Sequence, residues 1–310
     1  MLSWINPTTY PNIEQLQKSI RPVIIHPFRI SLVACSLAMV ATFLGSSASA
    51  ESSTDCEIGS GSPTDLKEIQ AGSHKGLLKG YLEPDSLPDS LKLLAAPPKK
   101  DSAAFDLDVA TAEDTFLLQG SSRWKLARRD ADLDFPAATG IYSCALGIQI
   151  SQEDTPKLYT LLRRSLTDAG MATYRAKNHY QRPRPFTQND KPMCTPEIEA
   201  GLRNDGSYPS GHTSVGWAWA LILSEIAPER QNQILSRGLA YGQSRSVCNV
   251  HWNSDVQAGF VMGSATVARL HSNPVFRADL RAAAGEVETL RKNNGQGNPN
   301  CSLELEALLR

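Results

Sequence analysis

The segment Gly206–Thr213, with the sequence GSYPSGHT, is followed by an almost unbroken apolar run over residues 215–227. Pro209 and Gly211 are residues typical of a turn, and the apolar run indicates a buried helix. The sequence therefore predicts a tight turn directly before that helix. Unpaired backbone N–H groups and the positive end of the helix dipole meet at such a point, which makes it suitable for binding an anion.

The same segment supplies two neutral hydrogen-bond donors, Ser210 and the Gly211 amide, and a titratable side chain, His212. A serine, a glycine and a histidine at a helix start are also typical of an ordinary cap and turn, so the segment alone does not establish a site. The functional interpretation depends on residues elsewhere in the chain, namely Lys177, Arg184, Arg245, His251 and Asp255.

Helical patterns extend over most of the chain after residue 100. Apolar residues recur at spacings of three and four over residues 155–178, as in an amphipathic helix. Runs of alternating β-branched residues between turn dipeptides are scarce. The predicted fold class is all-α, with further helices over residues 101–117, 123–133, 137–149, 228–245, 251–270 and 274–291.

The N-terminal segment, residues 1–50, has the features of a signal peptide. Basic residues precede an uncharged run over residues 30–50, which closes with Ala48-Ser49-Ala50, the small-x-small pattern of a cleavage site. An uncleaved membrane anchor is the alternative interpretation. No later segment has the roughly 20 continuous apolar residues that span a bilayer. We therefore expect a soluble exported protein, periplasmic or secreted, with no stable membrane insertion after signal cleavage.

Composition divides the rest of the chain into three segments. Residues 51–100 are rich in Gly, Ser, Pro and Asp and are expected to form an extended lead-in with one short helix near residues 88–94. Residues 101–292 form the predicted helical domain, and residues 293–310 a polar C-terminal tail. The formal net charge of −1 argues against a nucleic-acid binder.

Five cysteines remain once a signal peptide containing Cys35 is removed. An exported protein permits disulfides, but an odd number leaves at least one thiol outside intrachain pairs. No Cys-x-x-Cys arrangement occurs, which argues against a zinc ribbon. The pattern alone does not assign pairs among Cys56, Cys144, Cys194, Cys248 and Cys301.

His251 and Asp255 are four residues apart, so on a helix they share one face and can form a hydrogen bond. A carboxylate that holds one imidazole nitrogen leaves the other as an oriented lone pair, which suits a nucleophile or a base. Two other interpretations exist. In the first, His251 and Asp255 form a purely structural pair. In the second, they bind a metal ion together with His212, although nearby basic residues would repel a dication.

Lys177, Arg184 and Arg245 supply three positive charges. Arginine matches tetrahedral oxyanions with two parallel hydrogen bonds. Taken singly, Lys177 is also compatible with a charge that snorkels from the end of an apolar stripe, and Arg184 with a solvated loop. Taken together with the helix start and two histidines, these residues predict a phosphate-transfer site that needs no metal.

Three linked patterns then resemble a known signature: Lys177-x6-Arg184-Pro185, Pro209-Ser210-Gly211-His212 and Ser244-Arg245-x5-His251-x3-Asp255. This signature is shared by bacterial class A non-specific acid phosphatases, type 2 phosphatidic acid phosphatases and vanadium haloperoxidases. The preceding Gly206-Ser207-Tyr208 is similar to the class A version. A looser likeness extends from about residue 93 to residue 269.

The resemblance implies a helical bundle and a role for each matching residue. His251 would attack phosphorus, Asp255 would hold its other nitrogen, and His212 would protonate the leaving alcohol and later activate water. No metal or cofactor is implied. The phosphoryl oxygens would be bound by Lys177, Arg184, Ser210, Gly211 and Arg245.

The expected activity is hydrolysis of small-molecule phosphate monoesters, with phosphotransferase activity as a side reaction because the intermediate is covalent. The need for one neutral and one protonated histidine predicts a bell-shaped dependence of rate on pH. The apolar helices and the resemblance are compatible with a homo-oligomer. Alternatives are vanadate-dependent halide oxidation, lipid phosphatase activity and phosphate capture without turnover.

Overall fold

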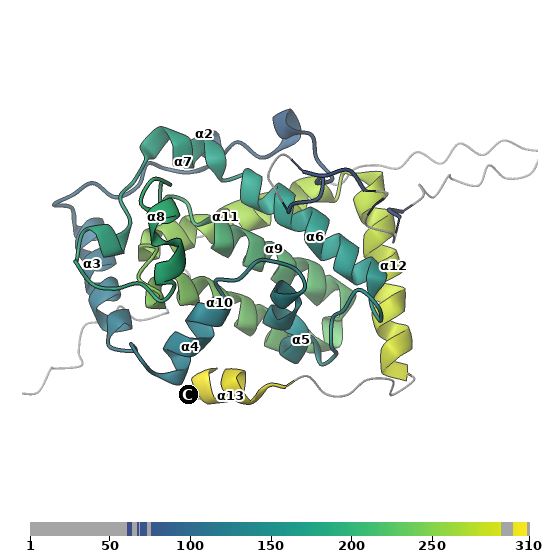
Figure 1. The fold of residues 1–310 in the computed structure, drawn as a ribbon. Coiled ribbons are helices and arrows are strands. Elements are labelled where there is room, and N and C mark those ends of the chain that lie inside the picture. Colours follow the sequence, from purple (N-terminus) through teal and green to yellow (C-terminus); the bar gives the residue numbers. More distant parts are fainter. Residues whose placement is uncertain (1–60, 64–66, 68, 73–75, 293–299, 309–310) are drawn as a thin grey trace, which may run out of the picture. The chain divides into compact units, whose positions relative to one another are not determined.

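The computed structural model describes residues 61–63, 67, 69–72, 76–292 and 300–308 (Figure 1). Regular structure in these residues is helical, apart from one isolated bridge between Ala71 and Leu78, so the predicted all-α class is confirmed. The predicted signal peptide lies outside the described residues. The longer helices are α3 (Ala103–Phe116), α6 (Pro156–Met171), α9 (Gly211–Ile226), α10 (Gln231–Val247), α11 (Asn253–Leu270) and α12 (Pro274–Lys292).

Shorter helices connect these elements. They are α2 (Ser90–Leu93), α4 (Ser122–Arg129), α5 (Gly140–Leu146), α7 (Tyr174–Tyr180), α8 (Glu199–Leu202) and α13 (Ser302–Leu308). Short 3-10 turns occupy Pro84–Ser86, Ala137–Thr139, Pro185–Thr187, Pro196–Ile198 and Pro228–Arg230. No helix among the described residues combines the length and the apolar character needed to cross a membrane.

Helix α9 is the centre of the core and packs against α6, α10 and α11 (Figure 1). Val215, Trp219 and Leu223 are almost completely buried, as the apolar run predicts for a helix covered on most sides. The Trp219 indole donates a hydrogen bond to the Leu162 carbonyl of α6 at 3.0 Å. Burial of α9 therefore fixes the position of its N-terminus, where the GSYPSGHT turn lies.

Helix α11 approaches this turn closely because Gly259 has no side chain. A Cβ atom there would lie 2.7 Å from both the Ser210 carbonyl oxygen and the Thr213 Cβ. The Ser210 amide also donates to the Asp255 carbonyl at 2.9 Å. The start of α9 is thus held directly against the first turns of α11.

Several helix boundaries differ from the sequence prediction. The helix predicted over 123–133 ends at Arg129, and the one predicted over 137–149 ends at Leu146. The helix predicted over 155–178 is interrupted after Met171, and α7 begins at Tyr174; the Ala176 amide of α7 is capped by Ser90 Oγ at 2.9 Å. The helix predicted from His251 begins only at Asn253.

The late start of α11 has a local cause. The Trp252 amide donates to Asp255 Oδ2 at 2.8 Å, so the Asp255 carboxylate caps the helix from its third position. The expectation that His251 and Asp255 share one helical face is therefore wrong, because His251 precedes the helix. A smaller correction concerns the helix predicted over 101–117, because α3 begins at Ala103 and Ser102 is its N-cap.

Residues of the lead-in contact the helices. The Tyr81 and Leu82 amides donate to the Asp168 carboxylate of α6 at 2.8 and 3.0 Å. The Tyr81 hydroxyl donates to Asp279 of α12 at 2.6 Å. Both Tyr81 and Leu82 belong to the hydrophobic core, so this part of the lead-in is packed against α6 and α12.

The C-terminal helix α13 is attached by a disulfide and by ion pairs. Cys301 is bonded to Cys144, and Glu304 accepts hydrogen bonds from Arg237 at 2.9 Å and from Arg129 at 3.1 Å. A second disulfide joins Cys194 to Cys248. The fifth cysteine of the expected mature chain, Cys56, lies outside the described residues.

Candidate active site

A cavity of about 380 Å³ collects most of the predicted site residues. They come from three separate stretches, namely α7 and the strip after it, the start of α9, and the end of α10 with the turn that follows. The predicted residues that line the cavity are Lys177, Arg184, Gly211, His212, Arg245 and His251. The other two, Ser210 and Asp255, are fully buried and do not line it.

Ser210 is the N-cap of α9. Its Oγ accepts a hydrogen bond from the Thr213 amide at 3.3 Å, whereas Gly211 is the first helical residue and faces the cavity. The cap interpretation and the anion-site interpretation therefore apply together. The capped helix start presents its Gly211 end, with the positive end of the dipole, to the cavity.

Lys177 is buried, with 4% of its side chain exposed, and its ammonium group donates to the Gly206 carbonyl at 2.6 Å and to Asp205 Oδ2 at 3.3 Å. Burial lowers the pKa of Lys177 to about 8, and the positive charge of Arg184 acts in the same direction. Its charge is therefore held in place by a carbonyl and a carboxylate at the wall of the cavity.

Arg184 has a nearly complete set of partners. Its Nη2 donates to Asp205 Oδ2 at 2.8 Å and its Nη1 to the Val250 carbonyl at 3.0 Å. Arg245 is different: its Nε and Nη1 are buried and have no partner among the described residues. Burial lowers the pKa of Arg245 to about 10. A buried guanidinium with free donors at a cavity is suited to an incoming oxyanion.

The geometry around His251 defines its neutral tautomer. Arg184 Nη1 lies 3.1 Å from His251 Nε2, and because a guanidinium can only donate, Nε2 must accept. The proton of the neutral ring is then on Nδ1, which faces Asp255 Oδ2 at 3.4 Å. This distance is that of a close ion pair but is long for a hydrogen bond, and Nδ1 has no partner within hydrogen-bond geometry.

Burial lowers the pKa of His251 well below its usual value, and the charges of Arg184, Lys177 and Arg245 act in the same direction. Burial raises the pKa of Asp255, although the charge of Arg182 and hydrogen bonds from neighbouring groups oppose this. The site therefore favours a neutral imidazole with its Nε2 lone pair on the side of the cationic groups.

His212 lies on the first turn of α9, and its Nε2 is 3.0 Å from the Ala131 carbonyl. A carbonyl can only accept, so Nε2 carries a proton and Nδ1 is the nitrogen that gains or loses one. Burial lowers the pKa of His212 well below its usual value, and the positive charge of Arg245 lowers it further. Binding of an anion beside Arg245 would act against this shift.

Apolar side chains form much of the cavity wall. Leu77 comes from the lead-in, and the others come from the helical domain: Leu133, Leu166, Met171, Leu202 and Val215. The chain between the Arg184 strip and the turn before α9 runs over residues 186–204. Of that segment only Leu202 lines the cavity.

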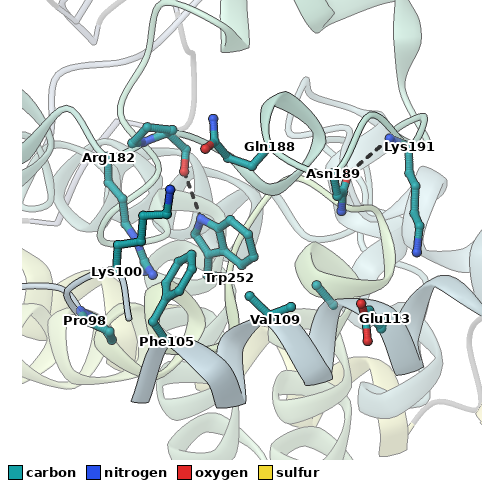
Figure 2. Close-up of a pocket in the computed structure, with 12 residues that line it drawn as sticks. Pro98, Lys100, Phe105, Val109, Glu113, Arg182, Gln188, Asn189, Lys191 and Trp252 are labelled. Carbon is teal, nitrogen blue, oxygen red and sulfur yellow. Dashed lines mark hydrogen bonds between the residues drawn. The ribbon is translucent and has the colours of Figure 1, made fainter. Parts of the chain in front are cut away.

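A second cavity, of about 610 Å³, contains none of the predicted site residues (Figure 2). Phe105 and Trp252 lie side by side in its wall, with ring centroids 5.3 Å apart, and the Arg182 guanidinium lies 5.5 Å from the Trp252 ring centroid. Arg182 also forms a hydrogen bond to Asp255 and so connects this wall to the active site.

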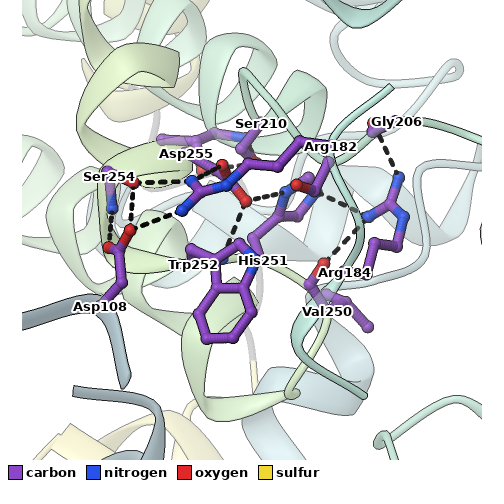
Figure 3. Close-up of polar contacts among 12 residues, drawn as sticks. Asp108, Arg182, Arg184, Gly206, Ser210, Val250, His251, Trp252, Ser254 and Asp255 are labelled. Atoms are coloured by element: carbon purple, nitrogen blue, oxygen red, sulfur yellow. Dashed lines mark hydrogen bonds and ion pairs between the residues drawn. The ribbon is translucent and has the colours of Figure 1, made fainter. Parts of the chain in front are cut away.

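Behind Asp255, the buried side chains of Arg182 and Asp108 form a network with the partly buried Ser254 (Figure 3). Arg182 Nη1 donates to Asp255 Oδ1 at 2.6 Å, and Nη2 donates to Asp108 Oδ2 at 2.7 Å. Asp108 also accepts from the Ser254 amide at 2.7 Å. The carboxylate behind His251 is thus fixed by an arginine that is itself fixed by a second carboxylate.

Sequence reasoning missed this network and also missed Asp205. Arg182 lies two residues before Arg184 in the extended QRPRP strip, so its position was a usable signal. Asp205 directly precedes the GSYPSGHT segment, but nothing distinguished it from an ordinary loop carboxylate. Asp108 is distant in sequence and carried no local signal. Among the described residues, no three His, Cys, Asp or Glu side chains are arranged to hold a metal ion.

Comparison with known proteins identifies the family to which this chain belongs. Residues 158–277 match the PAP2 superfamily, a range that contains all the predicted site residues. The chain is 44% identical over 213 residues to a non-specific acid phosphatase of Providencia stuartii, which covers 68% of this chain and 86% of that protein. It is 40% identical over 215 residues to the non-specific acid phosphatase of Salmonella typhimurium, with 69% and 85% covered.

An acid phosphatase of Zymomonas mobilis is similar over 203 residues at 44% identity, which covers 66% of this chain and 77% of that protein. These matches span most of each relative. The chain therefore belongs to the bacterial non-specific acid phosphatases of the PAP2 superfamily, and it is an acid phosphatase.

Proposed function

We propose that this acid phosphatase hydrolyses phosphate monoesters through a phosphohistidine formed on His251 Nε2. The observation that carries the proposal is the contact of Nε2 with Arg184 Nη1, which identifies Nε2 as the nitrogen with the lone pair. When a phosphoryl group enters, Arg184 can transfer this hydrogen bond to a phosphoryl oxygen. The released lone pair then faces phosphorus.

The proposed reaction has two steps. In the first, the Nε2–P bond forms, the P–O bond to the alcohol breaks, and His212 gives a proton to the departing oxygen. In the second, a water oxygen bonds to phosphorus, the Nε2–P bond breaks, and His212 takes a proton from that water. Asp255 stabilises the positive charge that develops on the His251 ring.

Charge stabilisation comes from groups already in place. Four residues of the cavity would surround the phosphoryl oxygens. Arg245 offers its free Nε and Nη1 donors, Gly211 its amide, and Lys177 and Arg184 their positive charges. Preorganised donors of this kind stabilise charge that is spread over the equatorial oxygens in the transition state. This set supports a mechanism that needs no metal ion.

Substrate binding would also prepare the acid. Burial and the nearby cations favour a neutral His212 before substrate binds, and the negative charge of a bound phosphoryl group would offset the nearby charge of Arg245. The pKa of His212 should therefore rise when substrate binds. A covalent intermediate further supports transfer of the phosphoryl group to alcohols in place of water. The predicted signal peptide and the two disulfides support export to the periplasm or the medium.

The test uses the expected mature chain, residues 51–310, and a His251→Ala variant, both assayed on a chromogenic phosphomonoester in excess EDTA. We expect the wild type to retain its rate after chelation and the variant to lose it. Rapid acid-free quenching with labelled substrate should give an acid-labile, base-stable phosphate on the wild type alone. Activity that is lost in EDTA and restored by a metal ion would overturn metal independence. A label that persists in the variant would overturn the role of His251.

A further inference from the structure

Asp205 places a carboxylate inside the cationic group. Its Oδ2 accepts hydrogen bonds from Arg184 Nη2 at 2.8 Å and from Lys177 Nζ at 3.3 Å. Its side chain is 34% exposed and lines the same cavity as the two histidines. Lys177 and Arg184 are therefore already paired with a carboxylate of the protein itself.

The groups that face Asp205 come from α7 and from the strip that follows it. They are Lys177 and Arg184, with Tyr174 close enough for its pKa to be raised by burial and, to a smaller extent, by Asp205. Arg245, by contrast, has free donors and does not contact Asp205. A phosphoryl group would therefore meet free donors on one side and a carboxylate on the other.

A phosphoryl oxygen that binds both Arg184 Nη2 and Lys177 Nζ must lie next to the oxygen that these groups already hold. Two anionic oxygens at such a distance repel each other unless they share a proton. A phosphate monoester with one proton can supply it, because its second pKa is about 6. The dianion has no proton to share.

We propose that Asp205 is a specificity-determining residue that selects the monoanionic form of the phosphoryl group by accepting a hydrogen bond from its P–OH. This inference rests on the proposed function, because it assumes that phosphate binds in this cavity. It gives the site a preference for acidic conditions that is separate from the ionisation of the histidines. The residue acts at binding, since its partners are the groups that hold the phosphoryl oxygens.

The test measures binding of inorganic phosphate by calorimetry between pH 5 and 7.5, so that turnover is not involved. The proteins are the wild type, Asp205→Asn, Asp205→Glu and the control Glu199→Gln. Glu199 is a carboxylate of neighbouring α8 that pairs with Arg203 on the surface. Unfolding curves of each variant show whether it is folded, and Asp205→Glu keeps a carboxylate if the amide disturbs the loop.

We expect the affinity of Asp205→Asn relative to the wild type to rise with pH. The rise should be about three- to sixfold over this range, because the second pKa of inorganic phosphate is about 7 and only about one-sixth to one-third of it is monoanion at pH 7.5. Glu199→Gln and Asp205→Glu should keep the pH dependence of the wild type. Loss of Asp205 also lowers the pKa of Lys177, which would weaken binding as the pH rises, so the expected rise cannot come from Lys177.

A constant ratio across the pH range would overturn the proposal. Equal weakening at every pH would show that Asp205 only holds Lys177 and Arg184 in place. Repeating the titration with His251→Ala separates this inference from the proposed function. A failed phosphohistidine assay with a rising affinity ratio would reject the mechanism and keep the role of Asp205.

Discussion

Arg182 donates a hydrogen bond to Asp255 at 2.6 Å, and both side chains are almost completely buried. The other oxygen of the same carboxylate faces the Nδ1 atom of His251 at 3.4 Å. Arg182 is in turn held by Asp108 of α3, which lies 74 residues earlier in the chain. The orientation of the proposed nucleophile therefore depends on a helix outside the three signature motifs.

Replacing Arg182 by glutamine should lower both stability and turnover. Breaking a buried ion pair by removing one partner destabilises a protein by about 3–5 kcal/mol, because the remaining charges are left uncompensated. We expect kcat to fall by about 10²-fold or more, the lower end of the contribution of an acid–base group, whereas KM changes little. Chemical unfolding and steady-state kinetics measure the two effects.

The control for this change is Arg175→Gln. Arg175 pairs with Asp89 but its side chain is 60% exposed, so both stability and kcat should stay close to those of the wild type. Arg182→Lys keeps the charge and should recover part of kcat with an altered pH profile. If Arg182→Gln lost stability but kept kcat and its pH profile, Arg182 would have a structural role only.

Much of the site could be predicted because its residues lie in three linked motifs of fixed spacing. Lys177, Arg184, His212, Arg245 and His251 all line one cavity, as their chemistry suggested. The contacts of Arg182 with Asp108 could not be predicted in the same way. They join residues far apart in sequence, and Asp108 has no local pattern that distinguishes it from a surface charge.

The fold shows the same division between local and long-range information. The apolar period predicted α9 and α12 well, because burial on one or all faces leaves a regular pattern. The break between α6 and α7 and the late start of α11 depend on capping by Ser90 and Asp255. The helix α13 depends on a disulfide and on ion pairs to Glu304, which residue periodicity does not reveal.

Replacing His212 by asparagine should lower kcat/KM most for substrates that have poor leaving groups. For an alkyl phosphate, loss of the general acid should lower kcat/KM by about 10²–10⁴-fold. For p-nitrophenyl phosphate the loss should be much smaller, because nitrophenolate leaves without a proton. Comparison of kcat/KM for the two substrates isolates the first chemical step. Equal losses on both substrates would show that His212 does not protonate the leaving group.

Phosphate binding should weaken as the pH rises through the pKa of Lys177. Burial lowers this pKa to about 8 in the empty cavity, so Lys177 is a cation below that pH and loses its charge above it. Calorimetric titrations with inorganic phosphate between pH 7 and 10 should therefore show a fall in affinity that becomes steeper above about pH 8. A bound anion raises the pKa, so the transition should lie higher for the complex.

Lys177→Arg tests the assignment, because a guanidinium stays charged over this range. Its affinity should change less above pH 8, even if the longer side chain lowers affinity at neutral pH. Lys177→Met should bind weakly at every pH and show no step near pH 8. A step of unchanged size in the methionine variant would mean that another group is titrating.

The Cys194–Cys248 disulfide should contribute to both stability and activity. Cys248 lies between Arg245 and His251, and the Cys194 amide donates to the Cys248 carbonyl at 3.2 Å. The bond spans 54 residues, for which the chain-entropy relation gives about 4 kcal/mol. Replacing both cysteines by serine should lower the free energy of unfolding by about 2–4 kcal/mol and reduce kcat/KM, since the turn that carries His251 loses its attachment.

The matched control is Cys144→Ser with Cys301→Ser, which removes a disulfide spanning 157 residues and attaching α13. None of the predicted site residues lies next to either of these cysteines. This pair should therefore lose stability while kcat/KM of the folded protein stays near that of the wild type. Guanidinium unfolding and initial rates at a temperature where both variants are folded give the comparison. A loss of kcat/KM in the control equal to that in the Cys194–Cys248 pair would show a general effect of instability rather than support of the His251 turn.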